Sequence, residues 1–144
     1  MKSAYPIRSA LLGVLTALVL LGPVAGARTV VNLRAEIRVA GIHAGLAVDM
    51  HRVALIHLHL HHVINCLVGV QGRPFDPQAG NPCKGLGHGA IPDAPANGNV
   101  HLDLVHALHL ALSGEKAATY PLAHRLALGA RHFLLLAKDA LAHG

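Results

Sequence analysis

The sequence predicts a mainly α-helical protein, a small antiparallel bundle of three to four helices with one long loop rich in glycine and proline. Three observations support this fold class. Apolar residues recur at intervals of three and four, which is the spacing of one buried helical face. The stretch 69–99 is dense in Gly, Pro, Asn and Asp, and periodic segments flank it. With 144 residues, of which 53% are hydrophobic and 13% charged, the chain can bury one modest core.

Residues 1–27 have the layout of a secretory signal peptide, which leaves a single His-rich domain over 28–144. Lys2 and Arg8 precede the apolar run Ala10–Leu21, and the small residues Ala-Gly-Ala end the segment. The alternative is an uncleaved membrane anchor, but the run is shorter than the roughly 20 apolar residues needed to span a bilayer. We therefore expect a periplasmic or secreted protein that has no stable membrane insertion after cleavage.

Two helices are expected before the long loop. Leu33–Leu46 is a weak helical stretch diluted by two glycines, and Asp49 can cap a second helix that runs to about Val68. The second helix has an apolar face at spacings of three and four, made of Val53, Ile56, Leu60, Val63, Ile64 and Leu67. The alternation over His57–His61 also fits a half-buried strand. We prefer the helix because the apolar stripe is much longer than the alternation.

Two more helices are expected after the loop. Asn99 can cap a helix through Leu112, which Ser113-Gly114 then breaks. Its core face would consist of Leu102, Val105, Leu108 and Leu112. A last helix starts around Thr119 to Pro121 and runs to about Ala142. Its core face would consist of Leu122, Leu126, Phe133, Leu136, Ala137 and Ala140.

The two cysteines, Cys66 and Cys83, are expected to form a disulfide, because export places them in an oxidising compartment. This bond would staple the long loop and contribute roughly 3 kcal/mol by restricting the unfolded chain. The alternative is a zinc or copper site with two nitrogen and two sulfur ligands, in which His62 and His88 join the cysteines. A count of free thiols distinguishes the two arrangements.

Histidine is the most unusual feature of the composition, with 13 residues against 12 Lys plus Arg. Neutral imidazole is the commonest protein ligand for transition metals, and two histidines one helical turn apart can chelate one ion. The candidate ligands are His57 with His61, His59 with His62, His106 with His109, and Asp139 with His143, with His132 on the same flank. The single histidines His43, His51 and His124 are instead expected to be solvated or hydrogen-bonded surface residues.

Other function classes find little support in the sequence. The formal charge is only +5, the basic residues are scattered singly, and 3% aromatic residues leave few rings to stack on bases. We therefore expect no nucleic-acid binding. The sequence also lacks the motifs for covalent haem attachment, zinc proteolysis, serine hydrolysis and phosphate-binding loops. It makes no positive case for an enzyme, although an enzyme is not excluded.

The C-terminal part of the chain carries a resemblance to a known family. It reads Leu122-Ala123-His124-Arg125 and then Ala137-Lys138-Asp139-Ala140-Leu141-Ala142-His143, within an exported chain rich in Ala and His. In composition it resembles the bacterial periplasmic small metal-binding proteins, which are four-helix bundles with histidines recurring along the helices. The resemblance implies an exported helical bundle that binds metal ions.

The expected function is binding of a divalent transition metal in the periplasm, as a buffer, scavenger or carrier. Imidazole and carboxylate ligands suit Cu(II), Ni(II) and Zn(II), and the affinity order favours copper. Two alternatives stay open. The chain could be a helical interaction protein of the cell envelope whose histidines are incidental or pH-sensing. It could also bind haem non-covalently, for which His57 and His109 are the best candidates.

Overall fold

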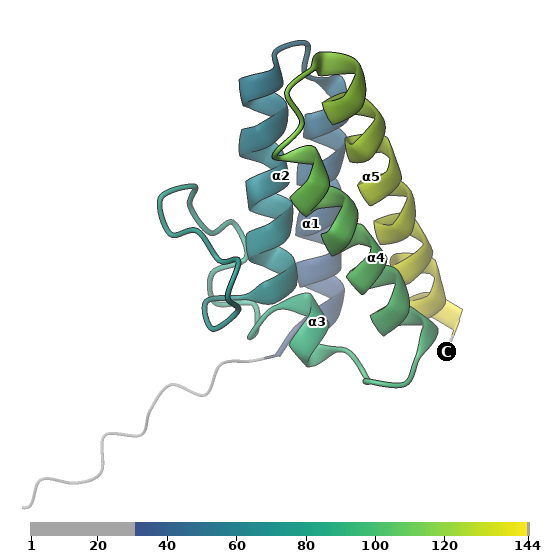
Figure 1. Ribbon diagram of the computed structural model, residues 1–144. Helices are drawn as coiled ribbons and strands as arrows, with labels where there is room; N and C mark the ends of the chain where they lie inside the picture. The colour runs from purple at the N-terminus through teal and green to yellow at the C-terminus, as the bar shows by residue number, and fades with distance from the viewer. Residues whose placement is uncertain (1–30, 144) are drawn as a thin grey trace, which may run out of the picture.

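The computed structural model describes residues 31–143, and the predicted signal peptide, 1–27, lies outside them. Over 31–143 the chain forms five helices and no strand: α1 (Leu33–Asp49), α2 (Val53–Val68), α3 (Ala90–Asp93), α4 (Asn99–Gly114) and α5 (Tyr120–His143). The four long helices lie side by side, and the short α3 lies at one end of them (Figure 1). The mainly helical class is thus confirmed. No helix of the described range combines the length and the apolar composition that crossing a membrane requires.

The first two helices follow the hydrophobic pattern but have different ends. α1 begins after Asn32, whose side chain accepts a hydrogen bond from the Ala35 N–H at 3.0 Å. It continues to Asp49, so this residue ends α1 and Arg52 precedes α2 in place of the expected cap. The predicted apolar face of α2 is buried except at its first residue, Val53. The segment His57–His61 is helical, so the strand alternative is wrong.

The last two long helices bury alanines where the sequence analysis predicts leucines. Their buried residues are Leu104, Ala107, Ala111 and Gly114 on α4, and Ala123, Ala127, Ala130, Leu134 and Ala137 on α5. The predicted core faces are therefore largely wrong: Leu102 is 56% exposed, and Leu122 and Leu136 are also exposed. Small side chains let two helix axes approach closely, so the alanine stripes meet and the leucines flank them. α4 also continues through Ser113-Gly114, where a break was predicted.

The segment between α2 and α4 is tied to the helices at both of its ends. Cys66 of α2 and Cys83 form the predicted disulfide, which excludes the mixed Cys/His metal site because neither sulfur is free. Gly69 follows α2 with φ 65°, and the returning chain passes so close that a Cβ there would lie 1.7 Å from the carbonyl oxygen of His88. One turn, α3, forms within the segment, although no regular element was predicted there.

Candidate metal centre

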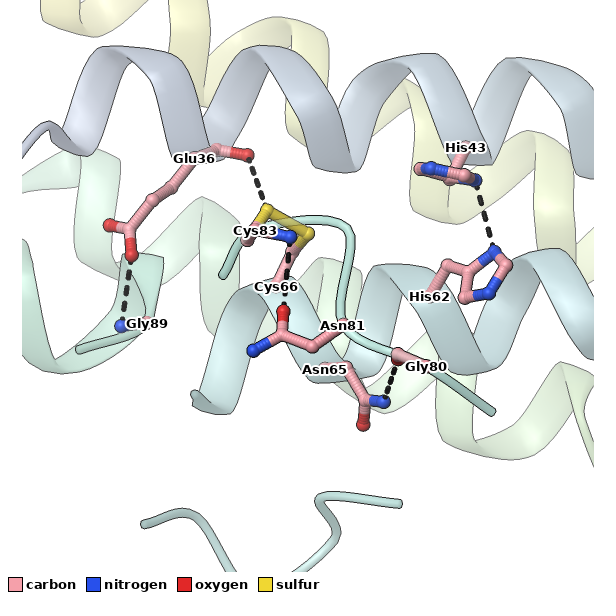
Figure 2. Close-up of a disulfide and its surroundings, with 9 residues drawn as sticks. All are labelled: Glu36, His43, His62, Asn65, Cys66, Gly80, Asn81, Cys83 and Gly89. Atoms are coloured by element: carbon pink, nitrogen blue, oxygen red, sulfur yellow. Dashed lines mark hydrogen bonds between the residues drawn. A yellow bond between two sulfur atoms is a disulfide. The ribbon is translucent and has the colours of Figure 1, made fainter. Parts of the chain in front are cut away.

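Packing of α1 against α2 brings three histidines together. His43 projects from α1 toward His59 and His62, which lie one turn apart on α2. Figure 2 shows His43 and His62 facing each other across the two helices. The Nδ1 atom of His43 lies 3.3 Å from Nδ1 of His59 and 3.2 Å from Nδ1 of His62. All three side chains are partly buried.

The chain fixes which nitrogen of His62 faces this cluster. The Nε2–H of His62 donates a hydrogen bond of 2.7 Å to the carbonyl oxygen of Ala79, so Nδ1 of the neutral ring carries a lone pair. Metal-ligating histidines characteristically donate their other N–H to a carbonyl or carboxylate in this way, which orients the ring. His62 is therefore held in the tautomer and orientation that a metal ligand requires.

The buried Asn65 holds the segment that carries Ala79. Its amide nitrogen donates to the carbonyl oxygens of Asp76 and Gly80 at 2.7 and 2.6 Å, and its side-chain oxygen accepts from the Asp76 N–H at 2.9 Å. These three hydrogen bonds bracket Ala79, and the disulfide anchors the chain three residues after Gly80 (Figure 2). The position of the Ala79 carbonyl is thus determined by a rigid support and not by a free loop.

The surroundings of His43 and His59 disfavour protonation of these two rings. The pKa of His43 is lowered to about 4, mainly by burial and also by the neighbouring His62 and His59, since two imidazolium ions repel each other at this distance. Burial and His62 also lower the pKa of His59. Neutral imidazole is the form that binds a metal ion. Protons therefore compete weakly for these nitrogens at neutral pH.

A second buried polar cluster lies on the same helix. Glu36 of α1 is 1% exposed, and its Oε1 accepts a hydrogen bond of 3.0 Å from the Gly89 N–H. The pKa of Glu36 is raised to about 7, mainly by burial and also by the nearby Asp93, while the hydrogen bond from Gly89 opposes the shift. The second oxygen of Glu36 is buried without a partner. This cluster accommodates a proton, whereas the histidine cluster excludes one.

The other predicted ligands lie elsewhere. His57 donates to the carbonyl oxygen of Ala117 at 3.0 Å, and His61 lies 3.0 Å from a carboxylate oxygen of Glu115, so both connect α2 to the turn after α4. The exposed rings of His106 and His132 both contact Phe133. His109 is also exposed, and His106, Asp139 and His143 line one groove between α4 and α5. Over residues 31–143, only His43, His59 and His62 bring three ligand-type side chains within 4.8 Å of one another.

Sequence reasoning missed His43. It has no histidine one turn away on α1, so the sequence predicts a solvated or hydrogen-bonded surface residue. The structure places His43 partly buried and within hydrogen-bond distance of two histidines of α2. Its position gives a weak signal after the fact. His43 lies between Ala40, Ala44 and Ala47, which are fully buried and form the stripe of α1 that packs into the core. A histidine bordering such a stripe is directed toward the neighbouring helix.

Comparison with known proteins gives no match to a family model, to a curated sequence or to a solved structure.

Proposed function

We propose that the protein binds a divalent transition metal through His43, His59 and His62, as a periplasmic metal buffer, scavenger or carrier built on an antiparallel helical bundle. The observation that carries the proposal is the convergence of three imidazole nitrogens. The Ala79 carbonyl supports it because it leaves Nδ1 of His62 with a lone pair that faces the cluster, and the low pKa of His43 supports it because the neutral ring is the form that binds a metal ion. The disulfide agrees with an oxidising compartment.

The spacing of the nitrogens favours Zn²⁺ over the copper that the affinity order favours. At a metal–nitrogen distance of about 2.05 Å, a tetrahedral ion places neighbouring nitrogens about 3.3 Å apart, whereas the right angles of a tetragonal Cu(II) site place them about 2.9 Å apart. The two known Nδ1 distances, 3.3 Å from His43 to His59 and 3.2 Å from His43 to His62, lie closer to the tetrahedral value. Three histidines would then occupy three corners of the tetrahedron, leaving the fourth to water or to an exchanging ligand.

Cobalt substitution tests the geometry directly. Protein expressed without a tag and stripped of metal should bind one Co²⁺ per chain and show the intense visible absorption of tetrahedral cobalt, which added Zn²⁺ should abolish. The variant H59Q should lose this absorption. The variant H57Q/H61Q should keep it, because those histidines bond to the turn after α4. Weak octahedral absorption, or equal losses in both variants, would show that binding follows histidine number and would overturn the proposal.

Metal analysis tests the physiological part of the proposal. Protein purified from the periplasm should contain one zinc per chain, and the H59Q variant should not. Copper at the same stoichiometry would support the site but show that its ion is copper and not zinc. Metal-free protein with an intact disulfide, isolated from zinc-replete cells, would argue against a role in metal handling.

A further inference from the structure

A largely apolar hollow lies beside α3, and none of its lining residues belongs to the cluster of His43, His59 and His62. It has a volume of about 500 Å³, within the range of about 300–1,000 Å³ usual for ligand sites. Its walls come from the end of α2, from α3 and the chain that follows it, and from α4, and they include Val68, Ile91, Ala94 and Leu108. Only three polar side chains line it: Gln71, His88 and His101. The hollow therefore suits an apolar ligand that engages imidazole.

The orientation of the His88 ring is fixed by hydrogen bonds to Asp93. Its Nδ1–H donates to Oδ1 of Asp93 at 3.0 Å, and its backbone N–H donates to Oδ2 of the same carboxylate at 2.7 Å. The Asp93 side chain is only 6% exposed, whereas the His88 side chain is 60% exposed. A carboxylate on Nδ1 fixes the tautomer and the orientation of the ring, with the lone pair on Nε2.

We propose that this hollow binds haem, with Nε2 of His88 as an axial ligand to the iron. A bare ion requires three or four protein donors, and within residues 31–143 no such set surrounds His88. An iron porphyrin brings four nitrogens of its own and requires only one or two axial ligands from the protein. Its macrocycle is also apolar, which matches the walls.

A second imidazole, that of His101, lines the hollow from α4. It lies on α4 and lines the same hollow as His88, which precedes α3. Its Nδ1 is buried without a hydrogen-bond partner. This site differs from the pair His57 and His109 that the sequence suggests. His57 already bonds to Ala117, and His109 is exposed on α4.

Titration with ferric haem, followed by visible absorption, tests the proposal. The Soret band should shift and saturate at one equivalent per chain, and H88Q should weaken binding at least tenfold. A96W should do the same, because Ala96 is an exposed residue on the wall and a bulky ring there fills the hollow without disturbing the core. H124Q, which changes an α5 histidine stacked on Tyr120, should bind haem like the unmodified protein. Circular dichroism should show equal helix content in all variants.

Two further variants complete the test. D93N should still bind haem but raise the potential of the iron, because the axial imidazole loses its carboxylate partner, and a merely structural role would not shift that potential. H43Q should bind haem normally, which separates this site from the proposed metal centre. Haem uptake beyond one equivalent without saturation, or uptake unchanged in both H88Q and A96W, would overturn the proposal.

Discussion

The two polar clusters on α1 have opposite chemistry: His43 meets histidines of α2, whereas Glu36 meets Gly89 and Asp93 at α3. His43 and Glu36 are seven residues apart, which places them two turns apart on one side of the helix, with the disulfide between them (Figure 2). Around His43, three imidazole nitrogens converge. Around Glu36, a carboxyl group meets the Asp93 carboxylate and a backbone N–H. The first cluster can gain a metal ion, and the second can gain a proton.

Burial alone does not determine what such a cluster binds. Burial is the largest cause of both pKa shifts, yet the pKa of His43 falls to about 4 and that of Glu36 rises to about 7. In each case the neutral form is favoured. Neutral imidazole offers a lone pair to a cation, whereas a neutral carboxyl group has already taken up its proton. The comparison predicts that metal should act on the His43 cluster alone and that pH should act on both clusters with opposite signs.

The largest expected effect separates the clusters by metal affinity. H43Q removes one of three ligands, so the Zn²⁺ affinity should fall about a thousandfold, or roughly 4 kcal/mol. E36Q should change the affinity less than twofold, because Glu36 belongs to the proton-binding cluster. Competition with a chelator of known affinity measures both. A comparable loss in E36Q would show that the clusters act as one site.

The sequence predicted the helices of this protein much better than their contacts. Helical periodicity locates α1, α2, α4 and α5 to within a few residues, because it depends on local spacing. On α5, however, the leucines and the alanines both recur with helical spacing, and only the closeness of the neighbouring helix decides which stripe is buried. The same limit applies to the site. His59 and His62 form a local pair, but their partner His43 comes from another helix.

Replacing Asn65 should lower both the stability of the fold and the zinc affinity of the histidine cluster. N65A removes three hydrogen bonds in a fully buried position, so the free energy of unfolding should fall by about 3 kcal/mol. Zn²⁺ affinity should fall about tenfold, because the Ala79 carbonyl is no longer held against His62. Denaturant unfolding and chelator competition measure the two effects. N81A, which removes one hydrogen bond to the Cys83 N–H, serves as the milder control. Unchanged zinc affinity in N65A would show that the loop does not orient His62.

The effect of Glu36 on the free energy of unfolding should be measurable at alkaline pH. Since the pKa of Glu36 is raised to about 7 on folding from an ordinary value of 4.5, its protonated form stabilises the fold at low pH, and this stability is lost as pH rises through 7. E36Q keeps a neutral side chain, so at pH 8 the variant should be more stable than the unmodified protein by about 2 kcal/mol. E115Q, at a half-buried carboxylate beside His61, should show no such gain. A destabilised E36Q at pH 8 would contradict the protonated assignment.

The smallest expected effect is the acid response of the histidine cluster in metal-free protein. Because the pKa of His43 is lowered to about 4 on folding, the unfolded chain takes up a proton first, and stability is lost as pH falls from 6.5 toward 4. Partial exposure reduces the effect to about 1 kcal/mol. H43Q should therefore lose less stability than the unmodified protein over this range in urea unfolding. Glu36 acts with the opposite sign between pH 4.5 and 6.5, so E36Q should lose more. The two side chains lie about 10 Å apart along the helix, so their effects should add in the double variant. Superimposable profiles for all four proteins would show that neither group is held neutral by burial.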